Sequence, residues 1–119
     1  MRAERDRGVA TVWTASIIAA LLCVVGFVYW LGAVVVTRHR AESAADLAAL
    51  AAAAHAAEGP GKACQRARWV AEGMSVALVT CRWERRDALV EVRSPLPGAL
   101  ARFGPVGARA RAGPVDKPP

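Results

Sequence analysis

Histidine, cysteine and the aromatic residues are scarce in this sequence of 119 residues. Two histidines and three cysteines are present, and aromatic residues make up 6% of the chain. Neither His39 nor His55 lies near a Gly-rich loop or a serine nucleophile motif, and no Cys or His spacing suits zinc. These absences argue against a serine-type hydrolase and against a structural zinc site. We therefore expect no enzyme activity, no cofactor and no metal ion.

Charged residues are absent between Arg7 and Arg38. A helix needs roughly 20 apolar residues to cross the hydrocarbon core of a bilayer, and the run over residues 9–37 exceeds that length. A secretory signal peptide has a shorter apolar region of about 7–15 residues. The sequence therefore predicts one uncleaved or pilin-type transmembrane helix, preceded by a charged head at residues 1–8. Its first partner is membrane lipid.

The two cysteines outside this run are Cys64 and Cys81, whereas Cys23 lies inside it and is expected to pack as a small hydrophobic residue. In small extracytoplasmic domains a cysteine pair usually forms a disulfide, so we predict a Cys64–Cys81 bond. Two buried free thiols are the alternative, which a cytoplasmic C-terminus would require. The pair, with a slight excess of arginine before the run, favours a single-pass protein of the cell membrane with a cytoplasmic N-terminus and an extracytoplasmic C-terminal domain.

Residues 38–58 continue the helix in our interpretation, because they are rich in alanine and contain neither glycine nor proline. Arg38, Glu42 and Asp46 follow at intervals of four and form a charged row. An apolar stripe lies on another face, and Gly59 begins the segment that ends the pattern. We expect this surface to pack against other subunits, and the alternative is that it packs only on the chain's own head domain. Its residues are Ser43, Asp46, Leu47, Leu50, Ala51 and Ala54.

Residues 62–112 are predicted to form a small α+β domain, so the fold class is α+β with one long N-terminal helix. A short helix ending at Gly73 precedes a hairpin of two strands over residues 75–84 and 88–93, and a third strand is expected within residues 99–113. Strict alternation in the first strand places four residues on the inner face: Ala77, Val79, Cys81 and Trp83. Residues 113–119 are expected to be a disordered tail.

The formal charge of +6 is concentrated near the C-terminus, where residues 62–119 carry eleven basic and five acidic side chains. One interpretation is a solvated basic surface, and the other is a membrane-tethered module whose basic hairpin holds an anionic polymer or acidic partner. That surface would consist of Arg82, Arg85, Arg86 and Arg93. Trp83 could stack on a nucleic-acid base, but we favour a core position beside Cys81, which argues against nucleic acid as the partner.

The order of these segments resembles the TadE/TadG group of tight-adherence, Flp-type pilus assembly proteins. The similarity lies in RGVATV at residues 7–12, in RAESAADLAALA at residues 40–51, and in a cysteine helix followed by a cysteine strand. Alternating valines follow, and ARARAGP at residues 108–114 is similar to small TadE-like proteins of high-GC Gram-positive bacteria. The resemblance covers roughly residues 7–113.

This resemblance implies a pseudopilin-like envelope protein that supports assembly of a pilus or secretion apparatus. Its implied partners are other envelope or pilus-assembly subunits, or further copies of itself. Because pilin-type precursors are cut after a glycine at the cytoplasmic edge of the helix, Gly8 and Val9 form the implied processing site. Pilins usually carry glutamate five residues after that glycine, where this chain has Trp13. An apolar side chain cannot neutralise a neighbouring amine in lipid, so this departure bears against cleavage and polymerisation.

Overall fold

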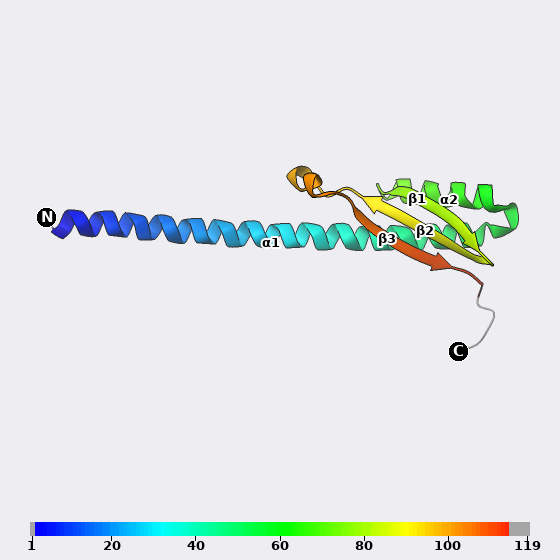
Figure 1. Cartoon of the computed structure of the whole chain (residues 1–119), viewed down its shortest axis with the longest axis horizontal. Coiled ribbons are helices and arrows are strands. Elements are labelled where there is room, and N and C mark those ends of the chain that lie inside the picture. Colours follow the sequence, from blue (N-terminus) through cyan, green and yellow to red (C-terminus); the bar gives the residue numbers. More distant parts are fainter. Residues whose placement is uncertain (1, 115–119) are drawn as a thin grey trace, which may run out of the picture. The chain divides into compact units, whose positions relative to one another are not determined.

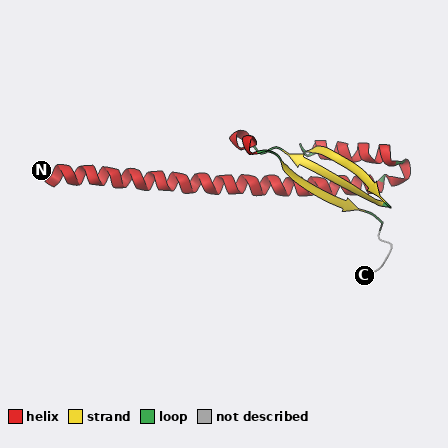
Figure 2. Ribbon diagram, viewed as in Figure 1, coloured by secondary structure: helices red, strands yellow, loops and turns green. Residues whose placement is uncertain are grey.

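A computed structural model describes residues 2–114, with side chains from residue 6 onward, and confirms the α+β class. Figure 1 labels the helices and strands, and Figure 2 colours them by type. In chain order they are α1 (Arg2–Ala54), η1 (Ala56–Glu58), α2 (Pro60–Gly73), β1 (Ala77–Glu84), β2 (Asp87–Ser94), η2 (Gly98–Phe103) and β3 (Val106–Ala112). Within the tail predicted at residues 113–119, residues 115–119 lie outside the described part of the chain.

Two compact units make up the chain, and we call them the anchor unit and the head unit. The anchor unit ends at Gly32, and the head unit comprises the described residues from Ala33 onward. Sequence analysis put the end of the membrane segment at residue 37, where the uncharged run stops. The compact boundary lies earlier because Ala33 and Val34 are already half-buried in the head unit. Packing against the head, and not the first charge, sets this boundary.

The anchor unit exposes apolar side chains on every side of α1. All residues from 6 to 32 are exposed, and by length and composition α1 is long and apolar enough to cross a membrane. Its serine and threonine hydroxyls, on Thr11, Thr14 and Ser16, donate hydrogen bonds of 2.8–2.9 Å to carbonyl oxygens one turn earlier. Because these bonds satisfy the hydroxyl donors within the helix, the segment needs no water to solvate them.

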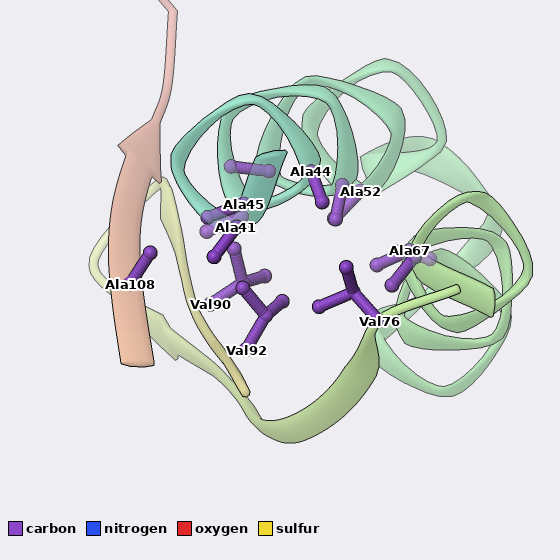
Figure 3. Packing of buried hydrophobic residues seen from close by; sticks show 14 residues of the cluster. Ala41, Ala44, Ala45, Ala52, Ala67, Val76, Val90, Val92 and Ala108 are labelled. Carbon is purple, nitrogen blue, oxygen red and sulfur yellow. The ribbon is translucent and has the colours of Figure 1, made fainter. Parts of the chain in front are cut away.

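The core of the head unit is built almost entirely from alanine (Figure 3). One face of α1 supplies alanines with the helical spacing i, i+3, i+4, i+7, and α2 supplies three more at intervals of four. The sheet contributes Ala88, Val90, Val92 and Ala108, and Val76 from the link between α2 and β1 also belongs to the cluster. The α1 residues in this core are Ala41, Ala44, Ala45, Ala48, Ala49 and Ala52, each at most 1% exposed. Small side chains thus allow the helices to lie close to the sheet.

The sheet has three antiparallel strands in the order β1-β2-β3. As predicted, Val90 and Val92 face the core, and β3 supplies the third strand, although residues 98–103 form a 3₁₀ helix instead. The alternation predicted for the first strand is wrong at its start, because Ala77 and Val79 are exposed whereas Leu78 packs on the core.

A β-bulge explains this difference in β1. Leu78 pairs with Val92 and Thr80 pairs with the preceding residue Glu91, so Val79 is an extra residue in the strand. An extra residue shifts the alternation of side chains by one position. Leu78, one residue before Val79, and Cys81, two residues after it, therefore both face inward.

The turn between α1 and α2 departs from the predicted helix end at residue 58. α1 ends at Ala54, and the short 3₁₀ helix η1 follows it. In η1 the Glu58 N–H donates a hydrogen bond of 3.0 Å to the His55 carbonyl. Gly59 then takes a φ of 101°, a left-handed value that favours glycine. Pro60 begins α2 instead of only ending the previous helix, since proline is well suited to the first helical position.

Gly59 in this turn and Gly61 in the first turn of α2 give a matched test of that geometry. We expect Gly59→Ala to lower the stability of the head unit by about 1–3 kcal/mol, because an L side chain is strained at its backbone angles. Gly61→Ala, inside α2 with open space around the site, should instead raise stability by about 0.5 kcal/mol. Thermal unfolding of the full chain in detergent, followed by circular dichroism, measures both shifts. Shifts of the same sign and size for the two variants would contradict this account.

Candidate functional site

The second half of α1 has two faces of different composition. The inward face is the alanine row of the core, whereas Leu47 and Leu50 on the opposite face are 48% and 58% exposed. Ser43, Asp46 and Ala54 are exposed beside them, and Ala51 is half-buried. The largest apolar side chains of this segment therefore point away from the chain's own head. This exposure disagrees with the alternative that the leucine stripe packs only on that head.

The exposed residues of this face repeat at alternating intervals of four and three. They are Val36, Arg40, Ser43, Leu47, Leu50 and Ala54, and all six are exposed. We call this set the outer seam. Alternating intervals of four and three keep side chains on one line of a helix, which is the spacing used when two helices pack along their length. The outer seam is therefore suited to contact a second helix.

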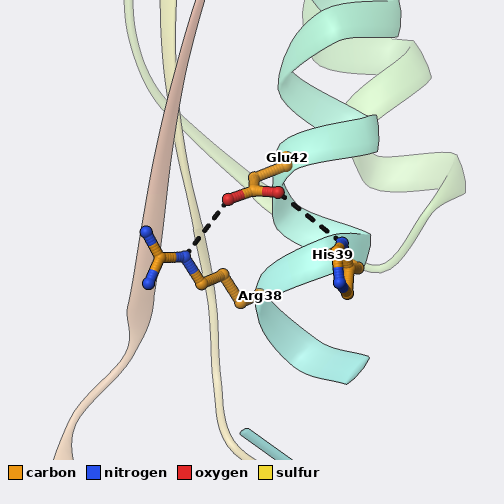
Figure 4. Close-up of polar contacts among 3 residues, drawn as sticks. All are labelled: Arg38, His39 and Glu42. Carbon is orange, nitrogen blue, oxygen red and sulfur yellow. Dashed lines mark hydrogen bonds and ion pairs between the residues drawn. The ribbon is translucent and has the colours of Figure 1, made fainter. Parts of the chain in front are cut away.

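A polar cluster lies near the start of this segment (Figure 4). The Glu42 carboxylate lies between two side chains, 3.2 Å from Arg38 Nε and 3.7 Å from His39 Nδ1. Arg38 and Glu42 are the first two members of the predicted charged row, and they do form an ion pair. Because all three side chains are solvent-exposed, the pair contributes little to stability. This cluster is a solvated surface of the helix where the uncharged run ends.

The predicted disulfide between Cys64 and Cys81 is present, with a Cα–Cα distance of 5.9 Å. It joins α2 to β1, two elements that pack on the same core. Trp83 lies two residues further along β1 and also packs against the core, in agreement with its predicted position beside Cys81. Cys23 is a free, exposed cysteine of the anchor unit.

The four arginines of the predicted basic hairpin are not gathered at one place. Arg85 and Arg86 form the two-residue turn between the paired residues Glu84 and Asp87, and Arg85 has a φ of 58°. Arg82 is exposed on β1, close to this turn in the chain, whereas Arg93 pairs with Ala77 near the other end of the hairpin. Arg93 lies six positions after Asp87 along β2, which corresponds to roughly 20 Å. Binding by this surface stays a prediction for the three arginines near the turn.

Two further arginines on β3 escaped the sequence analysis as site residues, although they lie on the same sheet. Arg109 Nε lies 3.5 Å from Glu91, and Arg111 lies 2.6 Å from Asp87. These ion pairs connect β3 to β2 and offset part of the positive charge. Only strand pairing brings the partners together, and they are 18 and 24 residues apart in the sequence.

A pocket of about 590 Å³ lies where the end of α1 meets the hairpin turn. Its lining comes from three separate segments: Ala53, Ala56, Pro60, Trp83, Arg85, Arg86, Gly113 and Pro114. The buried Trp83 Nε1 has no hydrogen-bond partner among residues 2–114. No sequence pattern indicated this pocket, because its walls meet only in the folded chain. Within the described residues no three His, Cys, Asp or Glu side chains are placed to hold a metal ion.

Most of α1 matches the sequence model of a known protein family. The family model described as "Putative Flp pilus-assembly TadE/G-like" matches residues 8–55. This segment is TadE/G-like. The match begins at Gly8, the first residue of the implied processing site, and ends one residue after α1. It therefore contains the apolar run, the alanine face and the outer seam. The resemblance inferred from the sequence is confirmed over these residues.

A curated relative matches a similar length of chain. The protein named Apoptosis inhibitor Rv3654c, from Mycobacterium tuberculosis (strain ATCC 25618 / H37Rv), is 55% identical over 47 residues. Those residues are 40% of this chain and 56% of the relative, so the match spans little more than half of that protein. No solved structure matches the chain. The TadE/G-like similarity thus describes the helix, and Gly8 and Val9 at its start stay a predicted processing site.

Proposed function

We propose that this chain is a single-pass, membrane-anchored, pseudopilin-like protein that supports assembly of a pilus or secretion apparatus in the cell envelope. The family description of the matched segment, pilus assembly, supports this role. The proposed role is structural and not catalytic. The anchor unit would lie in the membrane, where its exposed apolar side chains are solvated by lipid.

The topology we propose places the N-terminus in the cytoplasm and the head unit outside the membrane. The Cys64–Cys81 bond supports this placement, because disulfides persist in oxidising compartments and are rare in the cytosol. The arginines before the uncharged run point the same way.

The observation that carries the proposal is the exposure of Leu47 and Leu50 on a helix whose other face is fully buried. The head unit satisfies its own core with alanine and leaves both leucines in contact with solvent. We infer that a helix of another pilus-assembly subunit covers the outer seam. Ser43 and Ala54, the small residues of the seam, allow that helix to approach closely, and the two leucines pack between its side chains.

Photocrosslinking in native membranes tests this docking. A photoreactive residue at position 43 should form adducts with a pilus-assembly subunit, and Leu47→Asp with Leu50→Asp should reduce them about tenfold, because burying two carboxylates in an apolar contact is unfavourable. Gln65→Asp is the matched control, since it adds a carboxylate at an exposed position of α2.

The interpretation of this experiment depends on an intact head unit. The cystine and the thermal midpoint should be unchanged in all variants, because positions 47, 50 and 65 are exposed. Adducts that persist unchanged in the double variant would contradict docking at the seam. An adduct between two copies of this chain would assign the seam to self-association instead of to a second subunit.

A further inference from the structure

We propose that the loop between β2 and β3 rests on the membrane surface, with Phe103 at the boundary between headgroups and acyl chains and Arg102 at the lipid phosphates. The inference rests on the proposed function in one respect, namely that α1 anchors the chain in a bilayer. Its evidence lies within the head unit alone.

The hairpin turn fixes how the sheet runs along the part of α1 that belongs to the head unit. Arg85 and Ala53 line the same pocket, so the turn lies beside the C-terminal end of α1. From Asp87, β2 runs back for seven residues, about 23 Å, which equals the rise of about 15 helical residues. Figure 1 shows the strands running obliquely past this part of α1. Ser94 therefore lies about level with Arg38.

The first helix residues of the head unit are already partly covered on one side. Thr37 is 8% exposed and Ala33 and Val34 are half-buried, whereas Val36 on the other side is 59% exposed. Leu96, two residues after β2, is itself only 7% exposed. Since the strands end about level with Arg38, we assign this coverage to the loop over residues 95–105, which follows β2 directly.

The covered helix residues are the last part of the uncharged run, which ends at Thr37. With α1 spanning the membrane as proposed, these residues lie at the end of the span, because they directly follow the anchor unit, which ends at Gly32. A single exposed aromatic side chain means little by itself on a protein surface. Beside the end of a membrane span, an exposed phenylalanine can bury its apolar ring at the boundary between headgroups and acyl chains, as the apolar side chains of surface-bound segments do.

The composition of the loop fits a lipid surface. Residues 95–105 contain no acidic side chain, and Arg102 is their one charged residue. Leu96 and the half-buried Leu100 face the protein, whereas Phe103 is 69% exposed. An arginine next to an inserted ring can keep its aliphatic part in the apolar zone and its guanidinium at the phosphates. Gly98 and Gly104 take φ values of 57° and 95° at the two ends of η2, which sets the course of this turn.

Site-specific fluorescence of the full chain in vesicles tests the proposal. Three forms each carry one free cysteine labelled with an environment-sensitive dye: native Cys23, and Phe103→Cys or Trp69→Cys in a Cys23→Ala background. Trp69 is the matched control, because it is 70% exposed on α2. The vesicles contain phosphatidylcholine and phosphatidylglycerol with quenchers on the acyl chains. We expect quenching at position 103 to be at least about threefold that at position 69, with the deepest quenching at Cys23.

The three label positions separate the inference from the proposed function. If Cys23 is quenched but position 103 behaves like position 69, the loop does not touch lipid and this inference is overturned, while membrane anchoring stands. If Cys23 is not quenched, membrane anchoring itself fails. Ala101→Cys, at an exposed position of the same 3₁₀ helix, gives a second reading should the Phe103 variant not fold, and it must show the same contrast with position 69.

Discussion

Replacing both Cys64 and Cys81 by serine is expected to lower the free energy of unfolding of the head unit by about 3 kcal/mol. The bond closes a loop with a sequence separation of 17, and in the chain-entropy model a loop of that size contributes about this amount. The loss should be large relative to total stability, because domains of this size are only marginally stable.

The composition of the core explains why the cystine matters here. Apart from Val76, Val90 and Val92, every residue of the buried cluster is alanine. Alanine contributes little apolar surface, and burial contributes roughly 25 cal/mol for each Å² removed from water. The covalent link between α2 and β1 therefore replaces stabilisation that larger side chains provide in other small domains.

Denaturant unfolding of the full chain in detergent, followed through the sheet signal in circular dichroism, measures this loss. Cys23→Ser is the control, since that thiol is exposed in the anchor unit and has no disulfide partner. A double variant whose unfolding free energy lies within about 0.5 kcal/mol of the native value would show that packing alone holds the head together.

Two neighbouring residues of α1 should respond to substitution in opposite ways. Ala48→Leu is expected to lower the stability of the head unit by about 1–3 kcal/mol, because Ala48 is fully buried between the helix and the rest of the core. Leu47→Ala should change stability by less than about 0.5 kcal/mol, because Leu47 is 48% exposed and faces away from the core.

The same denaturation experiment measures the stability of both variants. Hydropathy alone would predict that Leu47→Ala destabilises the head unit more than Ala48→Leu does. Adding leucine to a helix usually adds apolar surface, and removing it usually costs burial. If Leu47→Ala proves as destabilising as Ala48→Leu, the leucine face must pack within the same chain, which would contradict the outer seam as a docking surface. A small effect on stability with a large loss of crosslinked partner would support it.

Much of the architecture follows from local patterns. The uncharged run predicts a membrane helix because charge is costly in lipid, and the alanine-rich segment predicts its continuation because alanine has the highest helix propensity. The Cys64–Cys81 bond was predictable because two cysteines in a small extracytoplasmic domain usually pair. The hairpin and the inward valines of β2 were predictable because side chains alternate along a strand with a period of two. The TadE/G-like character of residues 8–55 was visible in the order of residues 40–51.

Other features depend on contacts between distant segments. The bulge at Val79 is one, because local alternation gives no sign of an extra residue until β1 pairs with β2. The pocket at Trp83 is another, since its walls come from three segments that meet only after folding.

The sequence by itself determined the anchor, the helical extension, the hairpin and the cystine, because each depends on side chains that are near in the chain or chemically distinctive. Only the tertiary structure decided which face of α1 is core. Both faces of residues 41–54 carry apolar side chains, alanines on one and Leu47 and Leu50 on the other, so an apolar pattern alone does not tell which of them is the core. The sheet lies closest to the face with the smallest side chains, so the alanines are buried and the leucines remain exposed.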